Sequence, residues 1–241
     1  MEDTMLPDKD EKRGKNRRRQ IILYIGVAVC VFVAIIVTGT LSPGSAHAPV
    51  AQDPSIKVNE TLFIEEFNSD VNNWIPDLDN EAYYENGELH LSCKTLNGSK
   101  PLWSSQPAEF NNVAFQVKAK KISGPDQQYG LIFGQPGGSF ILFGITDSGY
   151  YGLMEWNSVE WLPLVNYTYS EYININGYNT LAVICKKAEE GYERQYVELH
   201  INGRYLTTAV TDTSADYKIG LYAGENDMHV AFDEFSVYDV D

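Results

Sequence analysis

The sequence predicts an all-β protein, an antiparallel β-sandwich preceded by one transmembrane helix. Residues 61–241 alternate apolar and polar positions in short segments, which turn-forming residues separate. This period-two pattern is typical of half-buried strands, and roughly 180 residues suffice for one buried core. An uncharged apolar run, residues 21–41, comes before them. We therefore expect a basic tail (1–20), the helix (21–41), a flexible stalk (42–60) and the sandwich (61–241).

The apolar run has the length of a membrane-spanning helix. About 20 apolar residues at a rise of about 1.5 Å match the ~30 Å hydrocarbon core of a bilayer. Residues 1–20 carry seven Lys and Arg against five Asp and Glu, and no Lys or Arg follows the run before Lys57. Positive charge on the N-terminal side keeps that side in the cytosol. We therefore expect a single-pass plasma-membrane protein, inserted in the lipid bilayer, whose C-terminal domain is extracellular.

A cleaved signal peptide is the alternative interpretation of the same run. Ala46-His47-Ala48 resembles a small-x-small cleavage site after a basic start and an apolar stretch. The run is longer than the roughly 7–15 apolar residues of a secretory signal. Pro49 would also follow the cut directly, where processing is poor. We favour a retained anchor, and a mature N-terminus near Pro49 would contradict it.

The charge of the chain restricts its partners. The net charge is −15 and the tail contributes +2, which leaves −17 on the residues after position 20. An acidic surface of this size repels nucleic acid and other anionic polymers and attracts cations. We therefore expect no nucleic-acid partner.

Two of the three cysteines belong to the predicted sandwich. Cys30 lies in the apolar run, whereas Cys93 shares strand parity with Leu89 and Leu91, and Cys185 shares parity with Leu181 and Val183. Both thiols are therefore expected to face the core. A disulfide between them and two free buried thiols both remain open. No CxxC or His-rich spacing predicts a metal site at the cysteines.

The stalk and the strands differ in composition. Ser42-Pro43-Gly44-Ser45-Ala46 mixes breakers with small residues, which is typical of an extended connector. Asn202-Gly203 is the strongest turn, because both residues tolerate positive φ in a two-residue hairpin. The expected strands are Glu88–Cys93, Val113–Lys121, Gly130–Phe133, Phe140–Ile145, Thr180–Lys186, Gln195–Ile201, Lys218–Tyr222 and His229–Tyr238.

The order of these segments resembles a known family of sandwiches. The quoted segments are Ile64–Phe67 with Trp74, Tyr129–Phe133, Phe140–Ile145, Gly149-Tyr150-Tyr151, Trp161–Leu164, Asn179–Val183, Val197–Gly203, Lys218–Ala223 and Val230–Val237. Together they resemble the concanavalin A-like, laminin-G-like jelly rolls. The chain looks most like bacterial members that include a keto-disaccharide hydrolase-like subgroup. The resemblance implies the fold of the whole predicted domain. It says little about function, because this fold hosts lectins, carbohydrate-binding modules, glycosidases and adhesion modules.

A glycosidase of this fold commonly carries two or three acidic residues at alternate positions of one strand. Such spacing brings the acid and the nucleophile to about 5–5.5 Å in retaining enzymes. Glu65-Glu66 and Asp233-Glu234 are adjacent pairs, whose side chains face opposite ways on a strand. We therefore expect a non-catalytic protein.

Candidate ligand-binding residues lie between positions 155 and 172. Glu155 precedes Trp156, and a carboxylate beside an exposed indole suits a sugar, which offers C–H faces and hydroxyl groups. Tyr167 and Tyr169 belong to an aromatic-rich stretch that would extend such a surface. We expect Trp161 to pack in the core, as its counterpart in the family pattern does, and leave Trp156 open between packing and binding.

The resemblance also implies a structural calcium ion near the first and last strands. By that resemblance its ligands would be Glu65 or Glu66 with Asp233, and Asp70 could join them. Calcium takes six to eight hard oxygen ligands, which an acidic domain can supply. The alternative is a solvated acidic edge without an ion.

Taken together, these features predict a membrane-anchored extracellular module that binds a carbohydrate or a cell-envelope polymer. A structural or protein-interaction ectodomain of an envelope complex, bound to a membrane protein partner, is the second hypothesis. A glycoside-processing enzyme is the third. Exposed aromatics would favour the first, an apolar patch the second and converging carboxylates the third.

Overall fold

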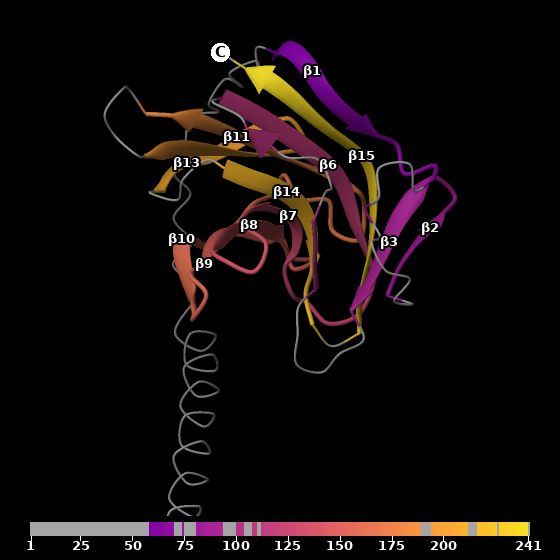
Figure 1. Ribbon diagram of the computed structural model, residues 1–241. Helices are drawn as coiled ribbons and strands as arrows, with labels where there is room; N and C mark the ends of the chain where they lie inside the picture. Colours follow the sequence, from indigo (N-terminus) through magenta and orange to yellow (C-terminus); the bar gives the residue numbers. More distant parts are fainter. Residues whose placement is uncertain are drawn as a thin grey trace, which may run out of the picture. The chain divides into compact units, whose positions relative to one another are not determined.

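Antiparallel strands form all the regular structure of the part of the chain that the computed structural model describes (Figure 1). The described residues are 58–69, 74, 81–93, 100–103, 108–109, 112–188, 194–211, 216–225 and 227–240. Within these ranges no helix is long and apolar enough to cross a membrane. The predicted tail (1–20), the predicted transmembrane helix (21–41) and most of the predicted stalk lie outside the described residues.

Fifteen strands follow one another along the described chain. They are β1 Val58–Glu65, β2 Ala82–Glu85, β3 Glu88–Cys93, β4 Lys100–Trp103, β5 Ala108–Glu109, β6 Asn112–Ser123, β7 Tyr129–Gly134, β8 Phe140–Ile145, β9 Tyr150–Trp156, β10 Trp161–Tyr169, β11 Asn179–Lys187, β12 Gln195–Ile201, β13 Arg204–Thr211, β14 Asp216–Ala223 and β15 Met228–Val240.

The strands form two sheets. Sheet A has the order β13-β12-β11-β6-β15-β3-β2, and β1 pairs with β15. Sheet B has the order β10-β9-β8-β7-β14-β4, and β5 pairs with β14. In Figure 1 the strands β1, β6, β11, β13 and β15 of sheet A run across the upper part of the domain, β2 and β3 lie at its right side, and β7, β8, β9 and β10 of sheet B lie below β6 and β11. The sandwich predicted from the alternation is confirmed.

The strongest predicted turn joins β12 and β13. Asn202 has a φ of 52° and Gly203 a φ of 73°, the pair of positive values that a two-residue hairpin of this kind requires. Ile201 pairs with Arg204 across the turn. The Asn202 side chain also accepts a hydrogen bond from the Thr180 amide at 2.8 Å, which ties the turn to β11.

The main core lies between the two sheets. Alternate residues of the central strands enter it, for example Phe115 of β6 and Phe133 of β7, whose rings meet edge to face at 5.4 Å. Trp74 is fully buried and packs against Phe67 at 5.6 Å and Phe235 at 5.0 Å. Burying such aromatic rings contributes about 3–5 kcal/mol each when truncation to Ala is the reference.

Cys93 and Cys185 are both buried, and they are not joined by a disulfide. Cys93 lies opposite Met228 on β15, and Cys185 lies opposite Val113 on β6. The prediction that both face the core is confirmed, and of its two open alternatives the structure has the thiols without a disulfide. Burial raises the pKa of Cys185 to about 12, so this thiol is inert in the folded domain.

Candidate functional site

The outer face of sheet B, turned away from the main core, is apolar. Successive side chains of a strand point to opposite faces, so residues opposite the core positions of β7, β8 and β9 face outward. These outward positions are Gly130, Ile132, Gly134, Phe140, Leu142, Gly144, Tyr150, Gly152, Met154 and Trp156. Strands that bury apolar side chains on both faces need a cover on the outer side.

Aromatic side chains provide this cover. Ile132, Phe140, Leu142 and Tyr222 form a buried apolar cluster, and three part-exposed indoles pack against it. The Phe140 ring meets Trp103 edge to face at 5.7 Å and Trp161 at 5.4 Å. Trp161 in turn lies 5.5 Å from Trp156 and 6.2 Å from Tyr222. We call Trp103, Phe140, Trp156, Trp161 and Tyr222 the aromatic cluster.

The β9–β10 hairpin positions two of the indoles. Trp156 ends β9 and pairs directly with Trp161, which begins β10. Asn157 holds the turn between them, because its side-chain oxygen accepts hydrogen bonds from the Val159 and Glu160 amides at 3.0 and 2.9 Å. In this Asx-type turn the side-chain oxygen takes the place of a backbone carbonyl as acceptor, and so holds the ends of β9 and β10 together. The indoles are therefore held side by side at the edge of sheet B.

A second aromatic group lies at the opposite end of the same hairpin. Tyr150 begins β9 and pairs with Tyr169 at the end of β10, and their rings meet at 5.8 Å. Tyr169 is 59% exposed and Tyr167 is 52% exposed. Partial burial of its hydroxyl, and secondarily the charge of Asp126, raises the pKa of Tyr167. Along β9 the distance from Tyr150 to Trp156 is about 20 Å.

A glutamine fills the space between the two aromatic groups. A Cβ on Gly144 would come within 2.9 Å of the Gln128 side chain, and one on Gly152 within 3.0 Å of its Nε2. The two glycines face each other across β8 and β9, so their lack of side chains admits the Gln128 amide. That amide is buried, and Nε2 donates to the Gly144 carbonyl at 3.4 Å.

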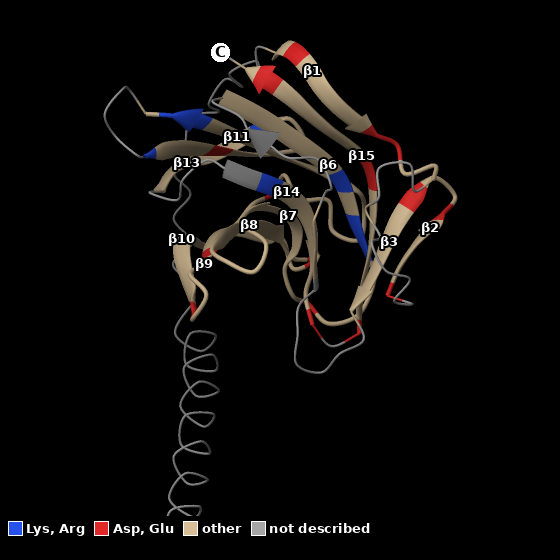
Figure 2. Cartoon of the chain, viewed as in Figure 1, with Lys and Arg blue, Asp and Glu red and all other residues tan. Residues whose placement is uncertain are grey.

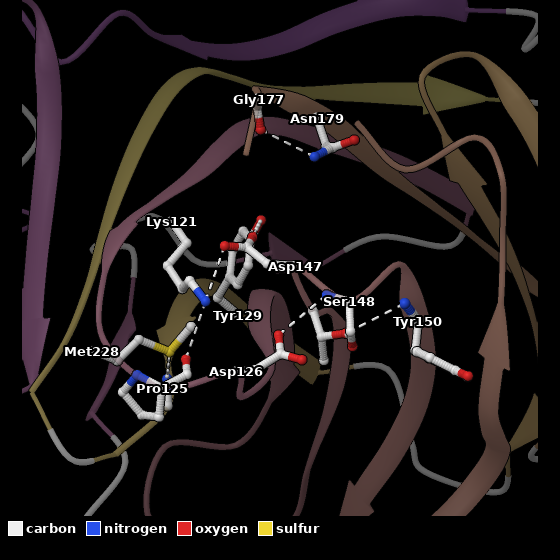
Figure 3. Close-up of polar contacts among 12 residues, drawn as sticks. Lys121, Pro125, Asp126, Tyr129, Asp147, Ser148, Tyr150, Gly177, Asn179 and Met228 are labelled. Atoms are coloured by element: carbon white, nitrogen blue, oxygen red, sulfur yellow. Dashed lines mark hydrogen bonds and ion pairs between the residues drawn. The ribbon is translucent and has the colours of Figure 1, made fainter. Parts of the chain in front are cut away.

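Polar contacts near Tyr150, at the start of β9, hold the neighbouring loops in place (Figure 3). Lys121 Nζ lies 2.9 Å from Asp147 Oδ2, and the Tyr129 hydroxyl donates to Asp147 Oδ1 at 3.2 Å. Asp126 Oδ1 accepts from the Ser148 amide at 3.3 Å. Burial, and then the Asp147 charge, raises the pKa of Tyr129 above its ordinary value. These contacts clamp the loop before β7 to the β8–β9 turn.

The residues predicted to bind a ligand do not all share one surface. Trp156, Tyr167 and Tyr169 belong to the β9–β10 hairpin, and two of them are clearly exposed. Glu155 pairs with Leu162 and Ile141, so it faces the opposite side of β9 from Trp156. Because neighbours on a strand alternate, the adjacent carboxylate and indole are not brought together.

The position of Trp161 differs from the prediction. We expected it to pack in the core, yet it is only half-buried and packs in the aromatic cluster on the outer face. Its partner Trp156 lies on that outer face, and paired residues of two strands share a face. The apolar pattern of the strand could not show which of its two faces the main core covers.

Sequence reasoning missed Trp103, Phe140 and Tyr222. These residues come from three separate strands, and only the order β8-β7-β14-β4 brings them near one another. Gly220 of β14 lies between Trp103 of β4 and Ile132 of β7, and a Cβ there would lie 3.0 Å from Ile132 Cγ1. One signal was available, since β8 is apolar at all positions except a glycine, which indicates covered faces on both sides.

The predicted calcium ligands Glu65, Glu66 and Asp233 each accept a hydrogen bond from a nearby residue. Glu65 is buried and its Oε1 accepts from the Phe67 amide at 2.8 Å, whereas Glu66 Oε2 accepts from the Asn68 side chain at 3.1 Å. Asp233 Oδ1 accepts from the Glu234 amide at 2.7 Å, in a bulge of β15. Asp70 lies outside the described residues. No three His, Cys, Asp or Glu of the described ranges are grouped to hold a metal ion, and calcium stays a prediction.

Comparison with known proteins finds likeness in structure only. No protein-family profile matches the chain. No curated protein sequence matches it either. A structure solved in work on endo-acting O-glycanases, with which prominent members of the human gut microbiota initiate mucin breakdown, superposes with a TM-score of 0.52 at 12% identity, covering 76% of this chain and 100% of that one.

The GH43 protein BlXynB of Bacillus licheniformis gives a TM-score of 0.53 at 12% identity. The match covers 73% of this chain but only 39% of that longer protein. At such low identity these similarities establish the fold alone. The described part of this chain therefore has the concanavalin A-like sandwich fold that its sequence resembles.

Proposed function

We propose that this protein is a membrane-anchored extracellular module that binds a carbohydrate or cell-envelope polymer without cleaving it. The aromatic cluster on the outer face of sheet B supports this most directly. Three part-exposed indoles gathered on one sheet face form the kind of surface on which the apolar C–H faces of sugar rings stack. No other face of the described domain gathers several indoles.

The layout of the hairpin favours a chain of sugars over a single one. Trp156 and Trp161 lie at one end of the β9–β10 hairpin, and Tyr150 and Tyr169 lie at the other, about 20 Å away. A polymer lying along the hairpin would contact both groups. Its hydroxyl groups would meet Tyr hydroxyls, which can donate and accept hydrogen bonds.

Membrane attachment complements weak, repeated contacts. In this proposal the run 21–41 spans the plasma membrane, and residues 42–57 lift the domain from the lipid. Many tethered copies would engage a repetitive polymer at the same time, so avidity would compensate for modest affinity at each site. The structural calcium ion belongs to this proposal as a stabilising element.

The non-catalytic part of the proposal follows from the chemistry of the face. Its central strands present glycine, aliphatic and aromatic side chains outward, which suit stacking better than proton transfer. Glu155, the carboxylate next to Trp156 in the chain, faces the other side of β9. Release of new reducing ends from a bound polymer would contradict this part.

The test is binding of the full chain to a broad panel of glycans and cell-wall polysaccharides, with calcium and after chelation. We expect Trp156→Ala to weaken binding to the polymer that is found by about tenfold or more, as removal of a central indole does at other interfaces. Tyr169→Ala should weaken the binding of long polymers more than the binding of short fragments, because Tyr169 lies at the far end of the hairpin from Trp156.

Tyr196→Ala is the matched control. Tyr196 is 46% exposed on β12 of sheet A, so its loss removes a comparable exposed ring from the other sheet. Its binding should equal that of the unmodified chain. Equal weakening by Tyr196→Ala and Trp156→Ala would exclude the aromatic cluster as the binding surface.

The second candidate function, protein interaction, rests on the tip of the same hairpin. Val159 is 80% exposed and Leu162 is 39% exposed beside the indoles. Exposed apolar side chains near an aromatic patch are also a feature of protein interfaces. A clean absence of binding across the polysaccharide panel would favour this function and a membrane protein partner.

A further inference from the structure

Two histidines form a pair on the outer face of sheet A, whereas the aromatic cluster belongs to sheet B. His90 lies on β3 and His229 on the neighbouring β15. His90 Nδ1 and His229 Nε2 are 2.9 Å apart and form a hydrogen bond, in which one of the two nitrogens carries the shared proton. The Tyr83 hydroxyl of β2 lies 3.4 Å from the same His229 nitrogen. Three donor atoms from three adjacent strands therefore gather around one point.

Neighbouring groups fix the orientation of His90. The Tyr83 ring stacks on the imidazole with centroids 4.9 Å apart and an interplanar angle of 6°. Glu88 Oε2 lies 3.5 Å from His90 Nε2, and the other Glu88 oxygen accepts a hydrogen bond from Tyr178. A carboxylate on one ring nitrogen keeps the proton there and directs the lone pair of the other nitrogen outward. This is the support that metal-bound histidines commonly have.

We propose that His90, His229 and Tyr83 form a binding site for a divalent transition metal of tetragonal geometry, Cu²⁺ or Ni²⁺. Imidazole nitrogens lie about 2.0–2.1 Å from such metals, so two of them bound at a right angle are about 2.9 Å apart. The observed separation is the same, 2.9 Å. Metal binding replaces the proton between the two facing nitrogens, so His90 then carries its proton on Nε2, next to Glu88, and His229 carries its proton on Nδ1.

The surroundings favour a cation that can reach the site. Tyr83 is 38% exposed and His229 is partly exposed, so one side of the group is open. The β2–β3 hairpin carries Glu85 and Glu88 opposite each other, on the same two strands as Tyr83 and His90. Figure 2 shows these acidic segments on β2 and β3, next to further acidic residues on β15. Negative potential of this kind raises the local concentration of metal ions.

The site is tested with Cu²⁺ added to the full chain, purified in detergent without a histidine tag. We expect one tightly bound ion per chain and an electron paramagnetic resonance spectrum with coupling to two imidazole nitrogens. His229→Gln should weaken binding by more than about a hundredfold, because loss of a ligand exceeds the 10–100-fold effect of a supporting residue. Glu88→Gln, which changes only that support, should weaken it about tenfold.

His200→Gln is the control, since His200 is a buried histidine beside a glutamate on β12 of the same sheet. Its Cu²⁺ spectrum and affinity should be unchanged. His229 is more exposed than His90, so His229→Gln remains informative if His90→Gln fails to fold. Absence of stoichiometric binding, a spectrum without two-nitrogen coupling, or equal affinity in His229→Gln would overturn the proposal.

Discussion

Asn179 joins three segments of the described chain through its buried amide. Its oxygen accepts from the Asn174 amide at 2.7 Å and from Asn202 Nδ2 at 3.0 Å. Its nitrogen donates to the Asn174 and Gly177 carbonyls at 3.1 and 3.2 Å. This fully buried side chain therefore makes four hydrogen bonds, which link the loop before β11 to the β12–β13 turn.

Replacement of Asn179 by Ala should lower the free energy of unfolding by about 3 kcal/mol, because buried donors and acceptors lose their partner. Urea denaturation of the full chain measures this loss. Asn166→Ala is the control, since Asn166 is exposed on β10 and a surface substitution changes stability by only about 0.5 kcal/mol or less. Similar losses in both variants would show that the hydrogen bonds of Asn179 are not the cause.

Tyr129 should make the domain sensitive to alkaline pH. Burial and the Asp147 carboxylate raise its pKa above the ordinary value of 10.0, so the folded state keeps a proton that the unfolded state releases. The resulting stability is fully present below pH 10 and is lost as the pH rises toward the higher folded value. Tyr178, whose pKa is also raised, adds to the same trend.

Denaturation at a series of alkaline pH values tests this prediction. Tyr129→Phe should remove part of the slope of unfolding free energy against pH, up to about 1.4 kcal/mol per pH unit. The substitution also removes the hydrogen bond to Asp147, which lowers stability by about 1 kcal/mol at every pH. An unchanged slope in Tyr129→Phe would assign the alkaline sensitivity to other tyrosines.

At the scale of elements, alternation predicts where strands lie in the sequence, but it does not predict which face of a strand the main core covers. Glu88–Cys93, Phe140–Ile145 and Gln195–Ile201 have the predicted bounds, because turn residues flank each of them. Alternation alone did not predict the strand β10, of which only Trp161–Leu164 was expected, from the family resemblance. It contains Pro163, and its pairing with β9 shifts register twice, between Pro163 and Val165 and between Val165 and Thr168. Each shift interrupts the period-two pattern on which the prediction depends.

Because the sequence pattern does not reveal which strands are neighbours, it predicts only part of the candidate site. Trp156, Tyr167 and Tyr169 could be proposed from local sequence, because an aromatic-rich stretch is visible without knowledge of pairing. Trp103 and Tyr222 could not, since they join the cluster only through the neighbours that β14 has in sheet B. The histidine pair is of the same kind: His90 and His229 are 139 residues apart in the chain. Sheet order is set by long-range packing, which a single sequence does not display.

At the scale of the whole molecule, the proposed function requires that the domain stays attached to the membrane. A retained run 21–41 would hold the full-length chain in the membrane fraction after alkaline carbonate extraction. Protease added to intact cells should digest the sandwich and leave the N-terminal tail, because the positive-inside rule predicts that this tail is cytosolic.

The mass of the mature chain decides between the anchor and a cleaved signal. With a retained anchor the mass includes residues 1–48, and Ala48→Phe changes it only by the substituted side chain. With cleavage after Ala48 the chain would begin at Pro49 and leave the membrane, and Ala48→Phe would block the cut, because signal cleavage needs a small residue there. A released chain would bind its polymer one site at a time, so loss of the anchor would remove the avidity on which the proposed function depends.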